Sequence, residues 1–207
     1  MFITFEGGEG TGKSTQVKLL AERFRAEGKT VLTTREPGGT PDAEALRNLL
    51  VSGAPNRWTA NEELLLNFAS RGSHLRHVIL PALADNIYVI CDRFIDSSYV
   101  YQVVAGGAHK GLYTSLLKTV ALRLIPDVTF ILDLPPRTGR ARAIKRISAA
   151  ILGTPENRFE LKDEKFHHKV RRAFIEIADK EPARCHLIDA AASELEVADR
   201  IWAKLHG

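Results

Sequence analysis

The chain has 207 residues, of which 44% are hydrophobic and 26% are charged. This composition is typical of globular proteins, and the length suits one domain with a sizeable core, so we expect a single domain over 1–207. The formal net charge is +4, and the basic residues are spread among acidic ones, which argues against a nucleic-acid-binding protein. No apolar run approaches the length that a membrane-spanning helix needs.

The two cysteines, Cys91 and Cys185, each lie beside an expected strand. Their number and spacing fit neither a metal site nor a disulfide framework, so we interpret both as small core residues. The first strand is expected to begin at residue 2, and we therefore expect no signal peptide. These features predict a cytoplasmic protein.

The first chemical motif follows that strand, which is expected at 2–5. Residues 7–14 read GGEGTGKS and fit the phosphate-binding pattern G-x-x-x-x-G-K-[ST], and a helix is expected over 13–27. In such a loop the backbone N–H groups surround the phosphates of a nucleotide, Lys13 reaches the β- and γ-phosphates, and the Ser14 hydroxyl holds Mg²⁺. The residues predicted to bind ATP are Gly7, Gly8, Glu9, Gly10, Thr11, Gly12, Lys13, Ser14 and Thr15.

Short apolar strands alternate with helices along the rest of the chain. Further strands are expected at 29–34, 87–91, 128–132 and 186–188. Helices are expected at 40–51, 59–84 with a bend at Pro81, 97–104, 110–124, from about 137 to an interruption at 153–155, 161–180 and 193–207. This alternation predicts an α/β protein with the P-loop NTPase fold, a five-stranded parallel sheet flanked by helices on both faces.

Ligands of such sheets bind outside the carboxyl ends of the strands. Arg35, Arg93 and the segment after Asp133 are therefore expected at the same edge as the phosphate-binding loop. A segment at about 137–160 carries the cations Arg140, Arg142, Lys145 and Arg146. We interpret it as a helical lid that closes over the phosphates and excludes water, with a solvated helical face as the alternative.

A phosphate-binding loop is shared by several classes of protein, and the rest of the sequence narrows the choice. Neither the Asn-Lys-x-Asp nor the Asp-x-x-Gly motif of guanine-nucleotide switches occurs, and 207 residues leave no room for the additional parts of a motor. Phosphoryl transfer to a small acceptor and a small ATP-driven ligase both remain. A nucleotide-binding interaction protein that hydrolyses ATP slowly is the alternative of a different class.

Four motifs, spread over essentially the whole chain, resemble those of the bacterial-type thymidylate kinases. They are Arg35-Glu36-Pro37-Gly38-Gly39-Thr40, then Asp92-Arg93-Phe94 with Ser97, Tyr101 and Gln102, then Pro126 to Asp133, and Asn157-Arg158-Phe159-Glu160. The resemblance implies transfer of the ATP γ-phosphoryl group to dTMP, which gives dTDP, with Mg²⁺ as cofactor. It also implies a homodimer, and Leu64, Leu65 and Leu66 offer more apolar surface than one buried helix face requires. Another nucleoside monophosphate kinase, or a deoxynucleoside kinase, is the nearest alternative.

The resemblance also assigns roles to individual residues. Lys13, Arg93, Arg146 and, second to Arg146, Arg142 are the expected catalytic cations, and Ser14 with Asp92 is the expected metal site. Glu9 is expected to contact the 3′-hydroxyl of the deoxyribose, Arg93 the acceptor phosphate, and Arg71 the edge of the thymine, with Tyr101 excluding a ribose 2′-hydroxyl. The expected substrate-binding residues are Glu9, Arg35, Phe68, Arg71, Arg93, Ser97, Ser98, Tyr101 and Gln102.

Several departures from the family pattern affect these roles. The stretch between Arg146 and Arg158 is longer than the usual lid and carries an apolar run at 147–152, and Asn157 replaces the usual aspartate before Arg158. The stacking aromatic of the family usually falls four positions before the helix arginine, where this chain has Asn67, and Phe68 is the adjacent aromatic. Some relatives carry an arginine inside the phosphate-binding loop, where this chain has Gly10, so the lid is expected to supply that charge. His167 and His168 are interpreted as helix residues without a catalytic role, because no metal or triad partners are spaced around them. His74 and His77 share a helix face with Arg71 at a spacing that fits either the core or the site, and we interpret both as core residues.

Overall fold

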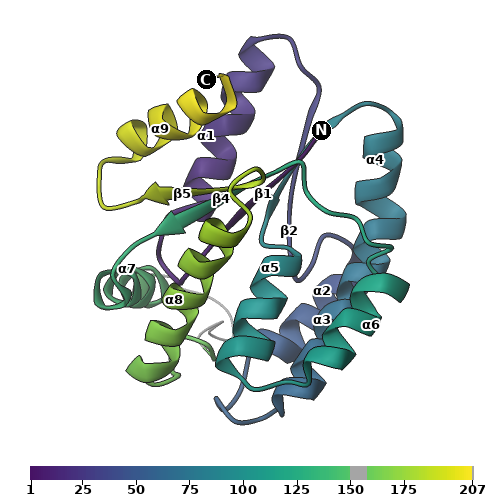
Figure 1. Ribbon diagram of the computed structural model, residues 1–207, viewed down its shortest axis with the longest axis vertical. Coiled ribbons are helices and arrows are strands. Elements are labelled where there is room, and N and C mark those ends of the chain that lie inside the picture. Colours follow the sequence, from purple (N-terminus) through teal and green to yellow (C-terminus); the bar gives the residue numbers. More distant parts are fainter. Residues whose placement is uncertain (150–157, 207) are drawn as a thin grey trace.

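The computed structural model describes residues 1–149 and 158–206, with side chains described outside 145–149 (Figure 1). Five strands form one sheet in the order β2-β3-β1-β4-β5, and every neighbouring pair is parallel. The strands are β1 (Phe2–Gly7), β2 (Val31–Arg35), β3 (Tyr88–Asp92), β4 (Val128–Asp133) and β5 (Cys185–Asp189). The predicted five-stranded parallel sheet is confirmed, with strand ends shifted by one or two residues.

Helices cover both faces of this sheet (Figure 1). On one face, α1 (Lys13–Ala26) and α9 (Glu194–His206) bury Leu20, Phe24 and Ile201 against the strands. The opposite face is covered by α3 (Ala60–His74), α4 (Leu80–Ala84), α5 (Ile95–Ser98), α6 (Lys110–Thr119) and α8 (Glu164–Lys180). The helix α2 (Pro41–Val51) lies against α3, and α7 (Pro136–Ala149) lies against α8.

Two of the predicted helices contain π-helical segments. The helix expected at 59–84 consists of α3, the π-helical segment η1 (Leu75–Ile79) and α4. Pro81 lies in the first turn of α4, where the missing N–H of proline is tolerated. The helix expected at 97–104 consists of α5 followed by the π-helical segment η2 (Tyr99–Ala105), and such segments are frequent at functional sites.

Three sequence-based boundaries are wrong or fall outside the described residues. The helix expected at 110–124 ends at Thr119, because Leu122 and Arg123 adopt positive φ values of 52° and 56° that a helix cannot contain. The helix expected from 161 begins at Glu164, where the Asp163 side chain accepts a hydrogen bond from the N–H of Phe166. The interruption expected at 153–155 lies outside the described residues.

The remaining predictions about the core concern cysteines and histidines. Cys91 and Cys185 are both buried free thiols, which confirms the core interpretation. His74 is fully buried, whereas His77 is exposed, so the core interpretation of His77 is wrong. Among the residues that the structure describes, no helix combines the length and the apolar character needed to cross a membrane.

Candidate active site

The phosphate-binding loop joins β1 to α1 and packs directly against α7. Gly10 has φ +67°, and a Cβ placed on it would lie 2.0 Å from the carbonyl oxygen of Gly139 in the first turn of α7. Any side chain at this position would collide with backbone atoms, so an arginine of the kind found in some relatives does not fit here. Any cation that acts on the transferring phosphoryl group in addition to Lys13 must therefore come from outside the loop.

Lys13 is buried and folded over its own loop. Its Nζ donates hydrogen bonds to the carbonyl oxygens of Gly8 at 2.8 Å and Gly7 at 3.3 Å. Burial, together with the nearby charge of Arg93, lowers the pKa of Lys13 to about 8. The charge is thus desolvated and directed at the centre of the loop, where it would act strongly on a bound phosphate.

Ser14 and Asp92 meet at the carboxyl end of β3. The Ser14 hydroxyl donates a hydrogen bond of 2.8 Å to Oδ2 of Asp92. A hydroxyl and a carboxylate are the hard oxygen ligands that Mg²⁺ prefers, with substrate phosphates and water completing its coordination. The predicted metal pair is therefore adjacent, and its chemistry fits Mg²⁺.

A cavity of about 1090 Å³ extends from the loop towards α2, α3 and η2. It is lined by the predicted residues Glu9, Gly10, Thr11, Gly12, Lys13, Ser14, Thr15, Arg35, Arg71, Asp92, Arg93, Ser97, Ser98, Tyr101 and Gln102. Gly7 and Gly8 line a smaller cavity behind the loop, and Phe68 lines neither of the two. One hollow thus unites the phosphate-binding residues with most of the residues expected to bind an acceptor.

Arg93 connects the two ends of this cavity. Its Nη1 donates to the carbonyl oxygen of Gly7 and to Ser97 Oγ, both at 3.0 Å, while its Nη2 donates to Glu9 Oε1 at 3.3 Å and to the Tyr101 hydroxyl at 3.2 Å. Its backbone has φ +70°, a conformation that costs free energy for a non-glycine residue and is often found at functional sites. Arg93 and Lys13 both donate to Gly7, so two cations converge on one point of the loop.

The Glu9 carboxylate is held as an anion. Oε1 accepts a hydrogen bond of 2.7 Å from the Tyr101 hydroxyl, and Oε2 lies 3.5 Å from Nδ1 of His167. Burial alone would raise the pKa of Glu9, but His167, Arg93 and Lys13 outweigh it and lower the pKa to about 2. Sequence reasoning missed His167; the signal was a histidine at helical spacing with Val170 and Phe174, which are buried on the same face of α8.

Glu6 is a second residue that sequence reasoning missed. Its buried carboxyl group accepts hydrogen bonds from the N–H groups of Phe94 at 2.8 Å and Ser97 at 3.3 Å, and from the Ser97 hydroxyl. Burial and the nearby Asp96 raise the pKa of Glu6 to about 7. Ser97 in turn accepts from Arg93, so Glu6 fixes the segment that orients this arginine. The available signal was a glutamate within an otherwise apolar strand.

Arg71 lies at the far end of the cavity. Its side chain is buried between the rings of Phe68 and Phe94, and it donates to Glu36 Oε2 at 2.7 Å and to Ser98 Oγ at 3.0 Å. Its Nη1 is buried without a hydrogen-bond partner among the described residues, and the arginine contributes to the cavity lining. Phe68 is occupied with this guanidinium and is fully buried, so the expectation that it faces the base is not met, whereas Asn67 lines the cavity.

Gln102 is oriented through a buried ion pair. It donates a hydrogen bond of 3.0 Å to Glu63 Oε2, and Oε1 of Glu63 pairs with Arg158. Arg158 also donates to the carbonyl oxygens of Leu50 at 2.9 Å and Ala54 at 3.2 Å. This cluster joins the segment at 158–160 to α2 and α3. Through Glu63 it also fixes the orientation of Gln102, which lines the cavity.

The remaining predicted cations make fewer contacts with the other site residues. Arg35 lines the cavity but is half-exposed and pairs with Glu44 at 3.1 Å. Arg142 lies on α7 and is exposed. Arg146 belongs to α7, but its side chain lies outside the described residues, as does part of the predicted lid at 137–160.

Comparison with known proteins places these features in a family. The family model described as thymidylate kinase matches residues 5–201. A thymidylate kinase of a Bradyrhizobium strain is 47% identical over 201 residues, which cover 97% of this chain and 87% of the relative. One from Caulobacter vibrioides is 49% identical over 191 residues, which cover 92% of this chain and 88% of the relative.

A solved structure agrees with these sequence matches. The crystal structure of thymidylate kinase from Ehrlichia chaffeensis superimposes with a TM-score of 0.78 at 35% identity, and the match covers 100% of this chain and 98% of that chain. The match of fold, length and sequence extends across the whole active-site cavity. The chain belongs to the thymidylate kinase family.

Proposed function

We propose that the protein transfers the γ-phosphoryl group of ATP to dTMP and releases dTDP and ADP. The observation that carries this proposal is that Lys13 and Arg93 both line one cavity large enough for two nucleotides and both donate to the carbonyl oxygen of Gly7 in the adjoining loop. Lys13 belongs to the phosphate-binding loop and Arg93 to the acceptor side. When both nucleotides are bound, a phosphate of ATP would replace the Gly7 carbonyl as the partner of Lys13, and the phosphate of dTMP would replace it as the partner of Arg93. The two phosphates would then lie next to each other between the two cations, in the alignment that direct transfer requires.

Each residue then has a defined task. The loop amides and Lys13 bind the ATP phosphates, and Arg93, assisted by Arg35, binds the phosphate of dTMP. Arg71, together with Ser98 and Gln102, recognises the thymine edge, while Glu9 accepts the 3′-hydroxyl. Tyr101 lines the same cavity, where its side chain would exclude the 2′-hydroxyl of a ribonucleotide. Arg146, with Arg142 second, neutralises charge on the transferring group when the lid closes.

Ser14 and Asp92 are the residues that would hold Mg²⁺. An ion held there would supply positive charge that offsets the charge of the ATP phosphates. We also propose that the protein acts in the cytoplasm. Both cysteine thiols are free, and a reducing compartment keeps thiols in that state.

The experiment is a coupled assay of ADP release with a panel of monophosphates. dTMP is expected to give the highest kcat/KM, with dUMP, CMP and AMP far lower. A preference for another monophosphate would show a different member of the kinase class, and ATP hydrolysis unaffected by any acceptor would indicate a nucleotide-binding interaction protein.

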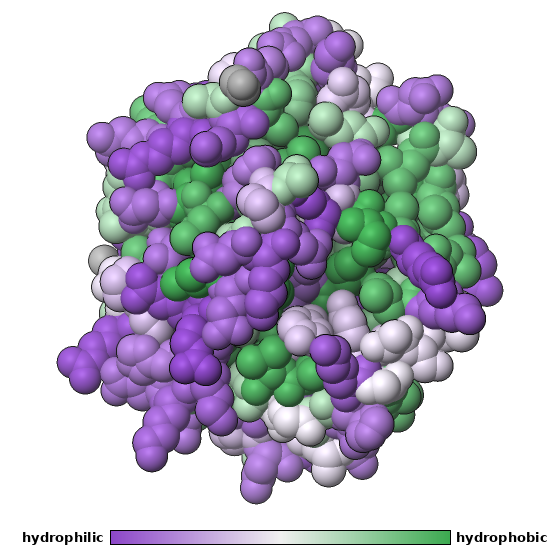
Figure 2. All heavy atoms as spheres, viewed as in Figure 1, coloured by the Kyte–Doolittle hydropathy of each residue, from purple (hydrophilic) through white to green (hydrophobic). Residues whose placement is uncertain are grey.

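We also propose that two copies associate through the apolar side of α3 and its neighbours. Leu65 on α3 is 48% exposed, and Leu122 and Ile125 after α6 are 62% and 46% exposed. Figure 2 shows a largely apolar area on the side of the molecule that carries α4. Exposed apolar area of this kind is typical of protein–protein contacts. Light scattering at micromolar concentration is expected to give twice the monomer mass, and Leu65→Glu to give the monomer mass.

A further inference from the structure

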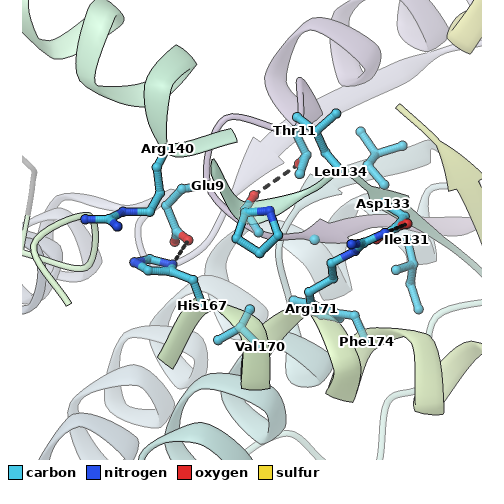
Figure 3. Close-up of a pocket in the computed structure, with 14 residues that line it drawn as sticks. Glu9, Thr11, Ile131, Asp133, Leu134, Arg140, His167, Val170, Arg171 and Phe174 are labelled. Atoms are coloured by element: carbon cyan, nitrogen blue, oxygen red, sulfur yellow. Dashed lines mark hydrogen bonds and ion pairs between the residues drawn. The ribbon is translucent and has the colours of Figure 1, made fainter. Parts of the chain in front are cut away.

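Glu9 lies between the large cavity and a smaller one of about 20 Å³ behind the loop (Figure 3). Its Oε1 is bound by Tyr101 and Arg93, which belong to the acceptor side. Among the residues that the structure describes, its Oε2 accepts no hydrogen bond of normal geometry. This oxygen lies 3.5 Å from Nδ1 of His167. Figure 3 shows the imidazole of His167 and the carboxylate of Glu9 pointing toward one another.

His167 occupies a position where an apolar residue would serve the fold better. It is 4% exposed, and it shares the buried face of α8 with Val170 and Phe174. Its Nε2 has no partner within the described part of the chain, and burying an unpaired polar atom costs free energy. A buried histidine that leaves one nitrogen unpaired calls for an explanation other than stability.

The charge state of Glu9 decides which atom carries the proton. The pKa of Glu9 is about 2, so its carboxylate can accept hydrogen bonds but cannot donate them. Nδ1 of His167 must therefore be the donor in this contact. A separation of 3.5 Å is long for a hydrogen bond, and contacts of this kind often shorten when a substrate binds.

Arg93 has to change partners during the proposed reaction. In this structure its Nη2 donates to Glu9 Oε1 at 3.3 Å. When the acceptor phosphate draws Arg93 away, Oε1 loses a donor and can accept the 3′-hydroxyl instead. Tyr101 still donates to Oε1 at 2.7 Å after this exchange, and a donor at Oε2 that does not bind the substrate would hold the second oxygen and so keep the carboxylate in its orientation.

We propose that His167 is a positioning residue that holds Glu9 through Oε2, so that Oε1 receives the 3′-hydroxyl of the acceptor nucleotide. This proposal rests on the proposed function. It concerns α8, an element that contributes no side chain to the large cavity. Recognition of the sugar hydroxyl would thus depend on a residue that never touches the substrate.

The test compares two acceptors that differ at one atom. His167→Leu replaces the imidazole by an apolar side chain of similar size and removes the donor. Its kcat/KM is expected to fall about tenfold with dTMP, as for loss of a hydrogen bond to a charged group, and to change less than twofold with 3′-deoxythymidine monophosphate. His167→Asn, whose amide nitrogen can occupy the place of Nδ1, is expected to recover much of the activity with dTMP.

Three further measurements make the outcome decisive. His168→Leu, on the exposed side of the same helix, is the matched control and is expected to leave both acceptors unaffected. In a Glu9→Gln background, His167→Leu is expected to have no further effect on dTMP. Equal losses with both acceptors, or no loss with either, would overturn the positioning role. Failure of the wild-type protein to phosphorylate dTMP would instead refute the proposed function.

Discussion

The two ends of the active-site cavity are held in different ways. On the acceptor side, buried ion pairs join distant segments: Arg71 to Glu36, and Arg158 to Glu63. On the nucleotide side, Lys13 donates to carbonyl oxygens of its own loop, and Arg142 on α7 is exposed. The acceptor side is therefore preorganised by the fold, whereas the cations of the nucleotide side need a phosphate to engage them. Substitutions on the first side should cost stability as well as activity, and those on the second side activity alone.

The largest effect is expected from Lys13→Met on the nucleotide side. We expect kcat to fall roughly a thousandfold or more, because a desolvated charge at the transferring phosphate is lost. Stability should not fall, since burial of this amine, which lowers its pKa to about 8, opposes folding. Steady-state kinetics and urea unfolding at pH 7 check both points.

The control for Lys13→Met is Lys18→Met, an exposed lysine on the same helix that should leave kcat unchanged. A large drop in the unfolding free energy of Lys13→Met would contradict the comparison, because it would make the loop lysine a structural residue.

Arg71→Met tests the acceptor side. We expect the unfolding free energy to fall by about 3–5 kcal/mol, because Glu36 would be left as a buried carboxylate without its arginine. The KM for dTMP should also rise. Urea unfolding measures the first effect and kinetics the second.

The double variant Arg71→Met/Glu36→Gln is expected to regain part of the stability but none of the dTMP affinity. Arg76→Met, an exposed position just beyond α3, serves as the control. Unchanged stability in Arg71→Met would mean that the ion pair does not preorganise the site.

Glu6 and Glu9 predict opposite effects of pH on stability. The folded-state pKa of Glu6 is raised to about 7, so its contribution is full below pH 4.5 and is lost as the pH rises through 7. The pKa of Glu9 is lowered to about 2, so its contribution is present above pH 4.5 and is lost as the pH falls towards 2. Glu6→Gln should raise the unfolding free energy at pH 8 by up to roughly 3 kcal/mol and leave it nearly unchanged at pH 4.5.

Urea unfolding between pH 4 and 8 checks this prediction. Glu62→Gln, at an exposed glutamate that caps α3, should not change the slope of the unfolding free energy against pH above pH 5. If Glu6→Gln is less stable than the wild type at pH 8, the hydrogen bonds to Phe94 and Ser97 need the ionised carboxylate, and the sign given above is wrong.

The sequence predicted the sheet and the loop well because their signals are local. Apolar strands, the pattern around Lys13 and the strand-end pair Asp92-Arg93 can each be identified within a few residues. The contacts of His167 with Glu9 and of Arg158 with Glu63 could not be predicted, because each joins segments far apart in the chain and only the packing of helices brings them together. The same reason explains the wrong expectation for Phe68, whose direction depends on the helix rotation that places Asn67 at the cavity.

Asn67→Phe gives the smallest expected effect and tests whether the acceptor side has room to improve. Asn67 lines the cavity, and its side-chain amide donates to the carbonyl oxygen of Glu63 within the same helix. A phenyl ring at position 67 would lie where the stacking aromatic of the family is expected. Stacking of this ring on the base is worth about 0.5–1.5 kcal/mol. The KM for dTMP should therefore fall about two- to twelvefold, while kcat stays the same. Phe68→Leu is the control: it alters the packing around Arg71 and should lower stability without lowering the KM for dTMP. A higher KM in Asn67→Phe would show that the base does not lie against position 67.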